Sequence, residues 1–127
     1  MTGEELLRTH LETLSRVDLD AAVALYSEDA IPHYPGRGPL SRDYRGRDEI
    51  RSFFAQIGEH TGGSFSATHE ALFSGEGQAA VLVSLVAERN GERREWKAVD
   101  VIRVEDGLIA YHRIFEGDQY SLDEWWS

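Results

Sequence analysis

The chain has 127 residues, no cysteine and a formal net charge of −10. This length fits one domain, the missing cysteines exclude disulfides and thiolate chemistry, and the charge argues against nucleic acid and anionic membranes as partners. No apolar run approaches the roughly 20 residues that cross a bilayer, and the first residues lack the basic and apolar parts of a signal peptide. We therefore expect a single domain over residues 1–127 that works in the cytoplasm.

Three helices are predicted in the first half of the chain. Thr2 and Glu5 form a capping-box pattern ahead of leucines at helical spacing, which predicts a helix over roughly residues 3–16. Asp18 can cap a second helix. A third helix follows Gly46 and ends near a glycine pair. Its apolar stripe consists of Ile50, Phe53, Phe54 and Ile57.

The segment SEDAIPHYPGRGPL, residues 27–40, places His33 and Tyr34 between Pro32 and Pro35. Proline fixes its own φ and pushes the residue before it towards extended geometry. The segment is therefore predicted to be a short strand or edge that carries two side chains able to exchange protons. Alternation along a strand allows only one of the two to point inward, and the sequence leaves open which one.

The second half of the chain predicts strands over residues 65–73, 78–89, 93–104 and 108–116, which are rich in β-branched and aromatic residues. The connections between them are short and rich in glycine, as in hairpins. Four sequential hairpin strands form an antiparallel meander. Helices followed by a curved sheet indicate an α+β domain.

Asp100 is the most informative residue of this sheet. A two-residue turn at Asn90-Gly91 places Val81 opposite Asp100. Alternation then puts Asp100 on the most apolar face of its strand, as the one carboxylate there. A buried carboxylate must be hydrogen-bonded, paired or protonated, because an isolated buried charge is costly. Its neighbours on that face are Trp96, Ala98, Ile102 and Val104.

The next hairpin leaves two partners open for Asp100. A two-residue turn at Asp106-Gly107 places Arg113 opposite it, with Tyr111 and Phe115 on the same face. An arginine partner lowers the pKa of the carboxyl group and keeps it ionised. The competing structural interpretation is a buried ion pair that sets the sheet register.

A three-residue loop with a glycine bulge changes the partner to His112. A histidine partner forms a proton-transfer pair with Asp100, whereas the absence of any partner raises the pKa of the carboxyl group. The sequence does not choose among these alternatives.

Three N-terminal helices, the SEDAIPHYPG segment and the four-strand meander together resemble the nuclear-transport-factor-two-like fold of ketosteroid isomerases and SnoaL-like polyketide cyclases. The stretches HYPGRGPL, YRG, TGG and DQYSLDEWW resemble the pattern HxPGxxPL, YRG, TGG and DQYxxDxFW of bacterial SnoaL-like proteins. The resemblance implies a cone-shaped α+β domain. In it, three N-terminal helices pack on a curved antiparallel sheet that encloses a pocket.

In ketosteroid isomerases a tyrosine and a protonated aspartic acid form the oxyanion hole, and a second aspartate moves the proton. The resemblance places the oxyanion aspartic acid on Asp100, the tyrosine on His10 and the proton-moving aspartate on Tyr34, next to His33. Only Asp100 matches in residue type. The implied catalytic residues are Asp100, His33 and Tyr34, and the implied substrate-pocket residues are His10, Trp96, Tyr111, Arg113 and Phe115.

The resemblance favours a small acid–base enzyme without a cofactor, of isomerase, cyclase or dehydratase type, acting on a hydrophobic carbonyl-bearing metabolite. The alternative is a non-catalytic protein of this fold that binds a small ligand. No HxH or HxxxH spacing occurs, so we expect no metal site. We also expect a homodimer, because the opposite sheet face is too apolar for full exposure to water. That face was expected to carry Leu82, Ser84, Val86, Val99, Val101 and Ile114.

Overall fold

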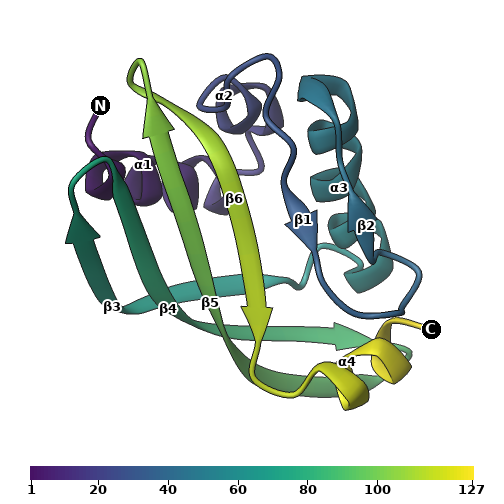
Figure 1. Cartoon of the computed structure of the whole chain (residues 1–127). Helices are drawn as coiled ribbons and strands as arrows, with labels where there is room; N and C mark the ends of the chain where they lie inside the picture. The colour runs from purple at the N-terminus through teal and green to yellow at the C-terminus, as the bar shows by residue number, and fades with distance from the viewer.

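The computed structural model describes all residues 1–127 and contains four helices and one six-stranded sheet (Figure 1). The helices are α1 (Gly3–Ser15), α2 (Leu19–Val23), α3 (Gly46–Thr61) and α4 (Gln119–Trp126). The strands are β1 (His33–Tyr34), β2 (Arg42–Asp43), β3 (Ser66–Gly75), β4 (Gln78–Arg89), β5 (Glu92–Glu105) and β6 (Leu108–Glu116). Not one of the helices has the length and apolar content that a bilayer crossing requires.

The strand order is β2-β1-β6-β5-β4-β3. Strands β3 to β6 form the predicted antiparallel meander, and the short strand β1 joins β6 in parallel. The sheet curves around one side of the molecule, and α1 and α3 lie on its concave side (Figure 1). We call the face towards these helices the inner face and the opposite face the outer face.

The predicted helices form for the reasons visible in the sequence. At the start of α1 the Glu5 N–H donates to the Thr2 hydroxyl, and the Thr2 N–H donates back to the Glu5 carboxylate, each at 3.2 Å. Asp18 caps α2 by accepting a bond from the Ala21 N–H at 3.1 Å. Helix α3 ends at Gly62, whose φ of 60° is readily adopted only by glycine.

The predicted register between β4 and β5 is confirmed. Asn90 and Gly91 have φ of 53° and 78°, as a two-residue hairpin turn requires, and Val81 lies opposite Asp100. The predicted inner face is also confirmed, because its aliphatic residues are buried and its larger ones pack against the core. These residues are Val81, Val83, Ala98 and Ile102, with Trp96 and Val104 packed against them.

Neither of the two registers predicted between β5 and β6 is observed, although His112, the partner in the second alternative, is the side chain that lies near Asp100. The turn at Asp106-Gly107 has two residues, as one alternative assumed, but a β-bulge follows it at Ala110. The extra residue shifts all later pairs, so Asp100 lies opposite Ile114 and not opposite Arg113 or His112. A shift of one residue moves each side chain to the other face of the sheet.

Because of this bulge, several β6 residues lie on the opposite face of the sheet from the one predicted. His112, Ile114 and Glu116 alternate on the inner face, so Ile114 does not belong to the outer face as expected. The residues expected beside Asp100 lie instead on the outer face, where Phe115 is 51% exposed. These residues are Tyr111, Arg113 and Phe115.

The HYPGRGPL loop and the C-terminal DQYSLDEWW stretch contact each other. The stretch forms α4, a helix that the sequence analysis did not predict. The Arg37 N–H donates to the Asp123 carboxylate at 2.8 Å, and the Trp126 indole N–H donates to the Tyr34 hydroxyl at 3.1 Å. A side chain at Gly36, whose φ is 95°, would overlap Asp123, so only glycine fits there. Helix α4 thus covers one end of the inner face.

Candidate active site

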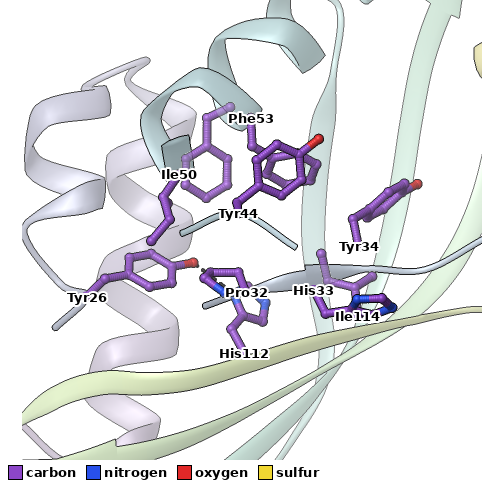
Figure 2. Close-up of a pocket in the computed structure, with 10 residues that line it drawn as sticks. Tyr26, Pro32, His33, Tyr34, Tyr44, Ile50, Phe53, His112 and Ile114 are labelled. Atoms are coloured by element: carbon purple, nitrogen blue, oxygen red, sulfur yellow. Dashed lines mark hydrogen bonds between the residues drawn. The ribbon is translucent and has the colours of Figure 1, made fainter. Parts of the chain in front are cut away.

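A buried chain of three polar side chains crosses the space between the helices and the sheet. The hydroxyl of Tyr26, which follows α2, lies 3.0 Å from His10 Nε2 on α1 and 2.8 Å from His112 Nδ1 on β6. Tyr26 is fully buried, and His10 and His112 are buried as well. Figure 2 shows the Tyr26 hydroxyl directed at the His112 ring. Residues far apart in the sequence are therefore joined in one hydrogen-bonded network.

The single hydroxyl proton of Tyr26 gives this network a direction. Tyr26 donates to one histidine nitrogen and accepts from the other. When Tyr26 donates to His112 Nδ1, His10 Nε2 carries the proton of the second bond, and His112 carries its own proton on Nε2. The Nε2 proton of His112 then faces Asp100.

Asp100 lies at the outer end of this chain. Its Oδ1 is 3.8 Å from His112 Nε2, which is buried and has no hydrogen-bond partner. The side chain of Asp100 is 23% exposed, against 5% for His112. Asp100 is therefore the member of the network that solvent or a ligand can reach, and His112, Tyr26 and His10 lie behind it.

The surroundings keep the interior groups neutral. Burial lowers the pKa of His10 to about 3, and the neighbouring His112 adds to this effect. Burial also raises the pKa of Tyr26 well above its usual value. His69 on β3 lies opposite the inner-face residue Val83, and burial lowers its pKa while Asp100 opposes the shift. His10 and Tyr26 are therefore neutral near neutral pH.

Tyr34 and His33 point in different directions. Tyr34 is 6% exposed and faces the interior, where its hydroxyl accepts the bond from Trp126. His33 is half-buried, and its Nδ1 lies 2.7 Å from Asp43 Oδ1 on β2. Tyr34 is therefore the side chain of this pair that points inward, and Asp43 holds His33 at the strand edge.

A second carboxyl group, Glu116, shares the inner face with Asp100. Glu116 lies opposite Ala98, and its Oε2 is buried without a hydrogen-bond partner. Burial raises its pKa from 4.5 to about 7, and Asp100 adds to the rise, whereas Tyr34 and Trp96 oppose it. Glu116 was not among the predicted site residues, and the bulge at Ala110 brings it to the inner face.

The enclosed cavity beside the network is small. It has a volume of about 10 Å³, which is close to the space of one water molecule. Tyr26 and His112 form one side of it, and Tyr44 and Phe53 lie on the opposite side (Figure 2). Phe54 also lines the cavity. The inner face is more open towards β3, where several apolar residues are only partly buried. These residues are Phe65, Ala67, Leu72, Leu85 and Trp96.

A family model for the SnoaL-like domain matches residues 7–112. The chain belongs to the SnoaL-like family. A search of curated protein sequences found no match. The matched span contains the whole network from His10 to His112, and Glu116 and α4 lie beyond it.

Solved structures show how widely this fold is shared. Bal32a, from a soil-derived mobile gene cassette, is 28% identical with a TM-score of 0.93, and the match covers 98% of this chain and 96% of Bal32a. An NTF2-like protein from Burkholderia pseudomallei is 19% identical with a TM-score of 0.89, covering 98% and 97%. Rv0760c from Mycobacterium tuberculosis, solved in complex with estradiol-17beta-hemisuccinate, is 19% identical with a TM-score of 0.78, covering 90% and 93%. The domain thus has the NTF2-like cone fold.

The predicted site residues divide into three groups in this SnoaL-like protein. Asp100, His10, Trp96 and Tyr34 lie on the inner side, where His112 and Tyr26 link Asp100 to His10. His33 lies at the strand edge, bonded to Asp43. The remaining pocket residues, Tyr111, Arg113 and Phe115, belong to the outer face and do not reach Asp100. No three histidine, aspartate or glutamate side chains come together in a way that could hold a metal ion.

Proposed function

We propose that this protein is a small acid–base enzyme that moves a proton on a hydrophobic, carbonyl-bearing metabolite. The reaction is of isomerase, cyclase or dehydratase type and uses no cofactor. One observation carries the proposal: Asp100 is the accessible end of a buried His112–Tyr26–His10 chain on an apolar sheet face. A carboxylate so placed can take a proton from a carbon next to a carbonyl group and return it elsewhere.

In this proposal Asp100 is the base and the groups behind it hold it in position. His112 Nε2 lies 3.8 Å from Asp100 Oδ1, and when Tyr26 donates to His112 Nδ1 the proton of His112 is on Nε2 and faces the carboxylate. As Asp100 gains a proton, the interaction with His112 weakens, and it strengthens again when the proton is returned. His10 is the far end of the chain and stays neutral throughout.

The proposal gives catalytic roles to both Tyr34 and His33, but only His33 must change its position to act. Tyr34 already faces the interior and can donate its hydroxyl proton to a ligand oxygen. His33 lines the edge of the small cavity but is bonded to Asp43, so it must turn away from Asp43 to act.

The ligand proposed is a hydrophobic small molecule. The partly buried apolar residues beside Asp100 offer it a surface, and the similar Rv0760c structure contains a steroid ester. The enclosed cavity of about 10 Å³ does not hold such a molecule. Binding therefore requires side chains of the α3 layer, such as Phe53 and Phe54, to move aside.

We also propose a cytoplasmic homodimer that pairs through the outer face. Leu82, Val99 and Phe115 lie side by side across β4, β5 and β6, and Phe115 is 51% exposed. A neighbouring row adds Phe73, which is 61% exposed, and Val101. A continuous apolar strip of this kind is typical of an interface between protein chains. The acidic, cysteine-free composition is consistent with the cytoplasm.

The function is tested by replacing Asp100 with asparagine. The assay follows deuterium exchange at the carbon next to the carbonyl group of β-tetralone by NMR. Wild-type protein should accelerate the exchange, and Asp100→Asn should reduce the acceleration by about 100-fold or more, the scale of lost acid–base assistance. Its stability should change by less than about 1 kcal/mol, because Asp100 is partly exposed and 3.8 Å from its partner.

A matched control separates the site from a general loss of charge. Glu105→Gln removes an exposed carboxylate at the end of the same strand, outside the site, and should leave the exchange rate close to wild type. Binding of steroids without any exchange in the wild-type protein would instead support the alternative, a non-catalytic ligand-binding protein. Equal exchange by wild type and Asp100→Asn would exclude Asp100 as the base.

A further inference from the structure

Unpaired polar atoms gather at the end of the inner face that α4 covers. Arg94 Nε, Trp96 Nε1, Glu116 Oε2 and Trp125 Nε1 are all buried and have no hydrogen-bond partner. The only other buried side-chain atom in this condition is His112 Nε2, which faces Asp100. Buried polar groups in folded proteins are nearly always paired, so this concentration needs a physical explanation.

The register brings Trp96 and Glu116 together. Glu116 on β6 lies directly opposite Ala98 on β5. Trp96 and Asp100 are each two residues from Ala98, so they are the two diagonal neighbours of Glu116 on the same face. Arg94 continues this face and is anchored to α4, because its Nη2 donates to the Ser121 hydroxyl at 2.5 Å. Glu116 is therefore located between Trp96 and the base proposed above.

Helix α4 covers this end of the inner face. The Trp125 ring packs against the Trp96 ring with centroids 5.6 Å apart, and Trp126 lies 6.3 Å from Trp96. Trp126 also donates to Tyr34, which lies next to Glu116. The group is thus aromatic on its sides and polar at its centre, as in a site for an oxygen atom on an apolar molecule.

The chemistry of these atoms defines what they can bind. An indole N–H is a donor only, and a carboxyl group that is protonated donates one bond and accepts others. Burial raises the pKa of Glu116 to about 7, which maintains a protonated fraction near neutral pH. Such a pair, with one fixed donor and one group that can donate or accept, suits a carbonyl or hydroxyl oxygen.

We propose that Glu116 and Trp96 form a second oxygen-binding subsite, which holds a carbonyl or hydroxyl oxygen of the ligand while Asp100 acts on another part of the same molecule. The inference rests on the proposed function for its reaction, although the subsite itself concerns binding. The ligand class that it specifies is a flat, hydrophobic molecule with two oxygen functions. Its two ends are separated by roughly the 7–8 Å between diagonal neighbours on a sheet, extended by the side chains.

The test compares two probes that differ by one oxygen atom, estradiol and its analogue without the phenolic hydroxyl. Binding is followed by intrinsic fluorescence, because all three tryptophans of the chain, Trp96, Trp125 and Trp126, belong to this group. Wild-type protein should bind estradiol at least about 10-fold more tightly than the analogue, as expected when a buried polar group loses its partner.

Three variants test whether the difference in affinity between the two probes comes from the subsite. Glu116→Leu should reduce the ratio of the two affinities to about one, and Glu116→Gln, which retains a donor and an acceptor, should keep part of it. Trp96→Phe, which removes the indole N–H but leaves two tryptophans as reporters, should also lower the ratio. The Trp96 variant serves as the readout if Glu116→Leu does not fold.

Asp100→Asn keeps the two proposals distinguishable. It should reduce the acceleration of proton exchange by about 100-fold or more and leave the affinity ratio unchanged, because Asp100 is not part of the subsite. A wild-type protein that binds neither steroid, or binds both equally, overturns the subsite. A ratio that persists in both Glu116→Leu and Trp96→Phe overturns it as well, whatever the result of the exchange assay.

Discussion

Replacing Glu116 with glutamine should change how the stability of the protein depends on pH. Burial raises the pKa of Glu116 from 4.5 to about 7. Between these two values the folded protein holds a proton that the unfolded chain releases, so the wild-type protein loses stability as the pH rises through this interval. The full shift corresponds to at most about 3 kcal/mol, and the partial exposure of Glu116 makes this an upper limit.

Urea unfolding followed by tryptophan fluorescence measures the effect. Glutamine has nearly the same shape and does not titrate. Wild type and Glu116→Gln should therefore differ least near pH 4.5, and the variant should gain on the wild type by up to about 3 kcal/mol near pH 8. Glu105→Gln on β5 is the matched control, because that side chain is exposed at the end of the same sheet. It should show no such divergence.

The result that refutes the reasoning is a constant difference between wild type and Glu116→Gln over this pH interval. The carboxyl group would then titrate alike in the folded and unfolded states. A difference that grows towards acid pH would reverse the sign and would mean that a positive partner stabilises the carboxylate in the folded protein.

Five further substitutions test the packing and the assembly. Tyr26→Phe leaves two buried histidine nitrogens unpaired and should lower the free energy of unfolding by about 1–3 kcal/mol, measured in urea. Val17→Gly should raise it by about 1 kcal/mol, because exposed Val17 has a φ of 56°, and a melting temperature that does not rise would contradict this. Gly36→Ala should destabilise more than Gly62→Ala, because both positions have positive φ but only a side chain at Gly36 overlaps α4; thermal melts compare them. Leu82→Glu should convert a dimer to a monomer in light scattering, and a monomeric wild type at micromolar concentration would disprove the outer-face interface.

Local patterns in the sequence were sufficient for most secondary-structure elements and for one sheet register. The capping box at Thr2, the cap at Asp18 and the Asn90-Gly91 turn act over a few residues, so their consequences can be read from neighbouring positions. The same turn placed Asp100 on the inner face, since strand alternation carries that information along β5. Helix α4 was missed because the DQYSLDEWW stretch was used only as part of the family pattern.

The partners of Asp100 depended on tertiary structure. The bulge at Ala110 has no signal in the residues around it, yet it exchanges the faces of β6 and brings His112 and Glu116 inward in place of Arg113. A bulge forms where the packing of the curved sheet favours it, and that packing involves elements distant in the sequence. The Tyr26 hydroxyl likewise meets histidines 16 and 86 residues away, so its role exists only after the helices have docked on the sheet. Short-range geometry therefore determined which residues are available on each element, and long-range packing decided which of them meet.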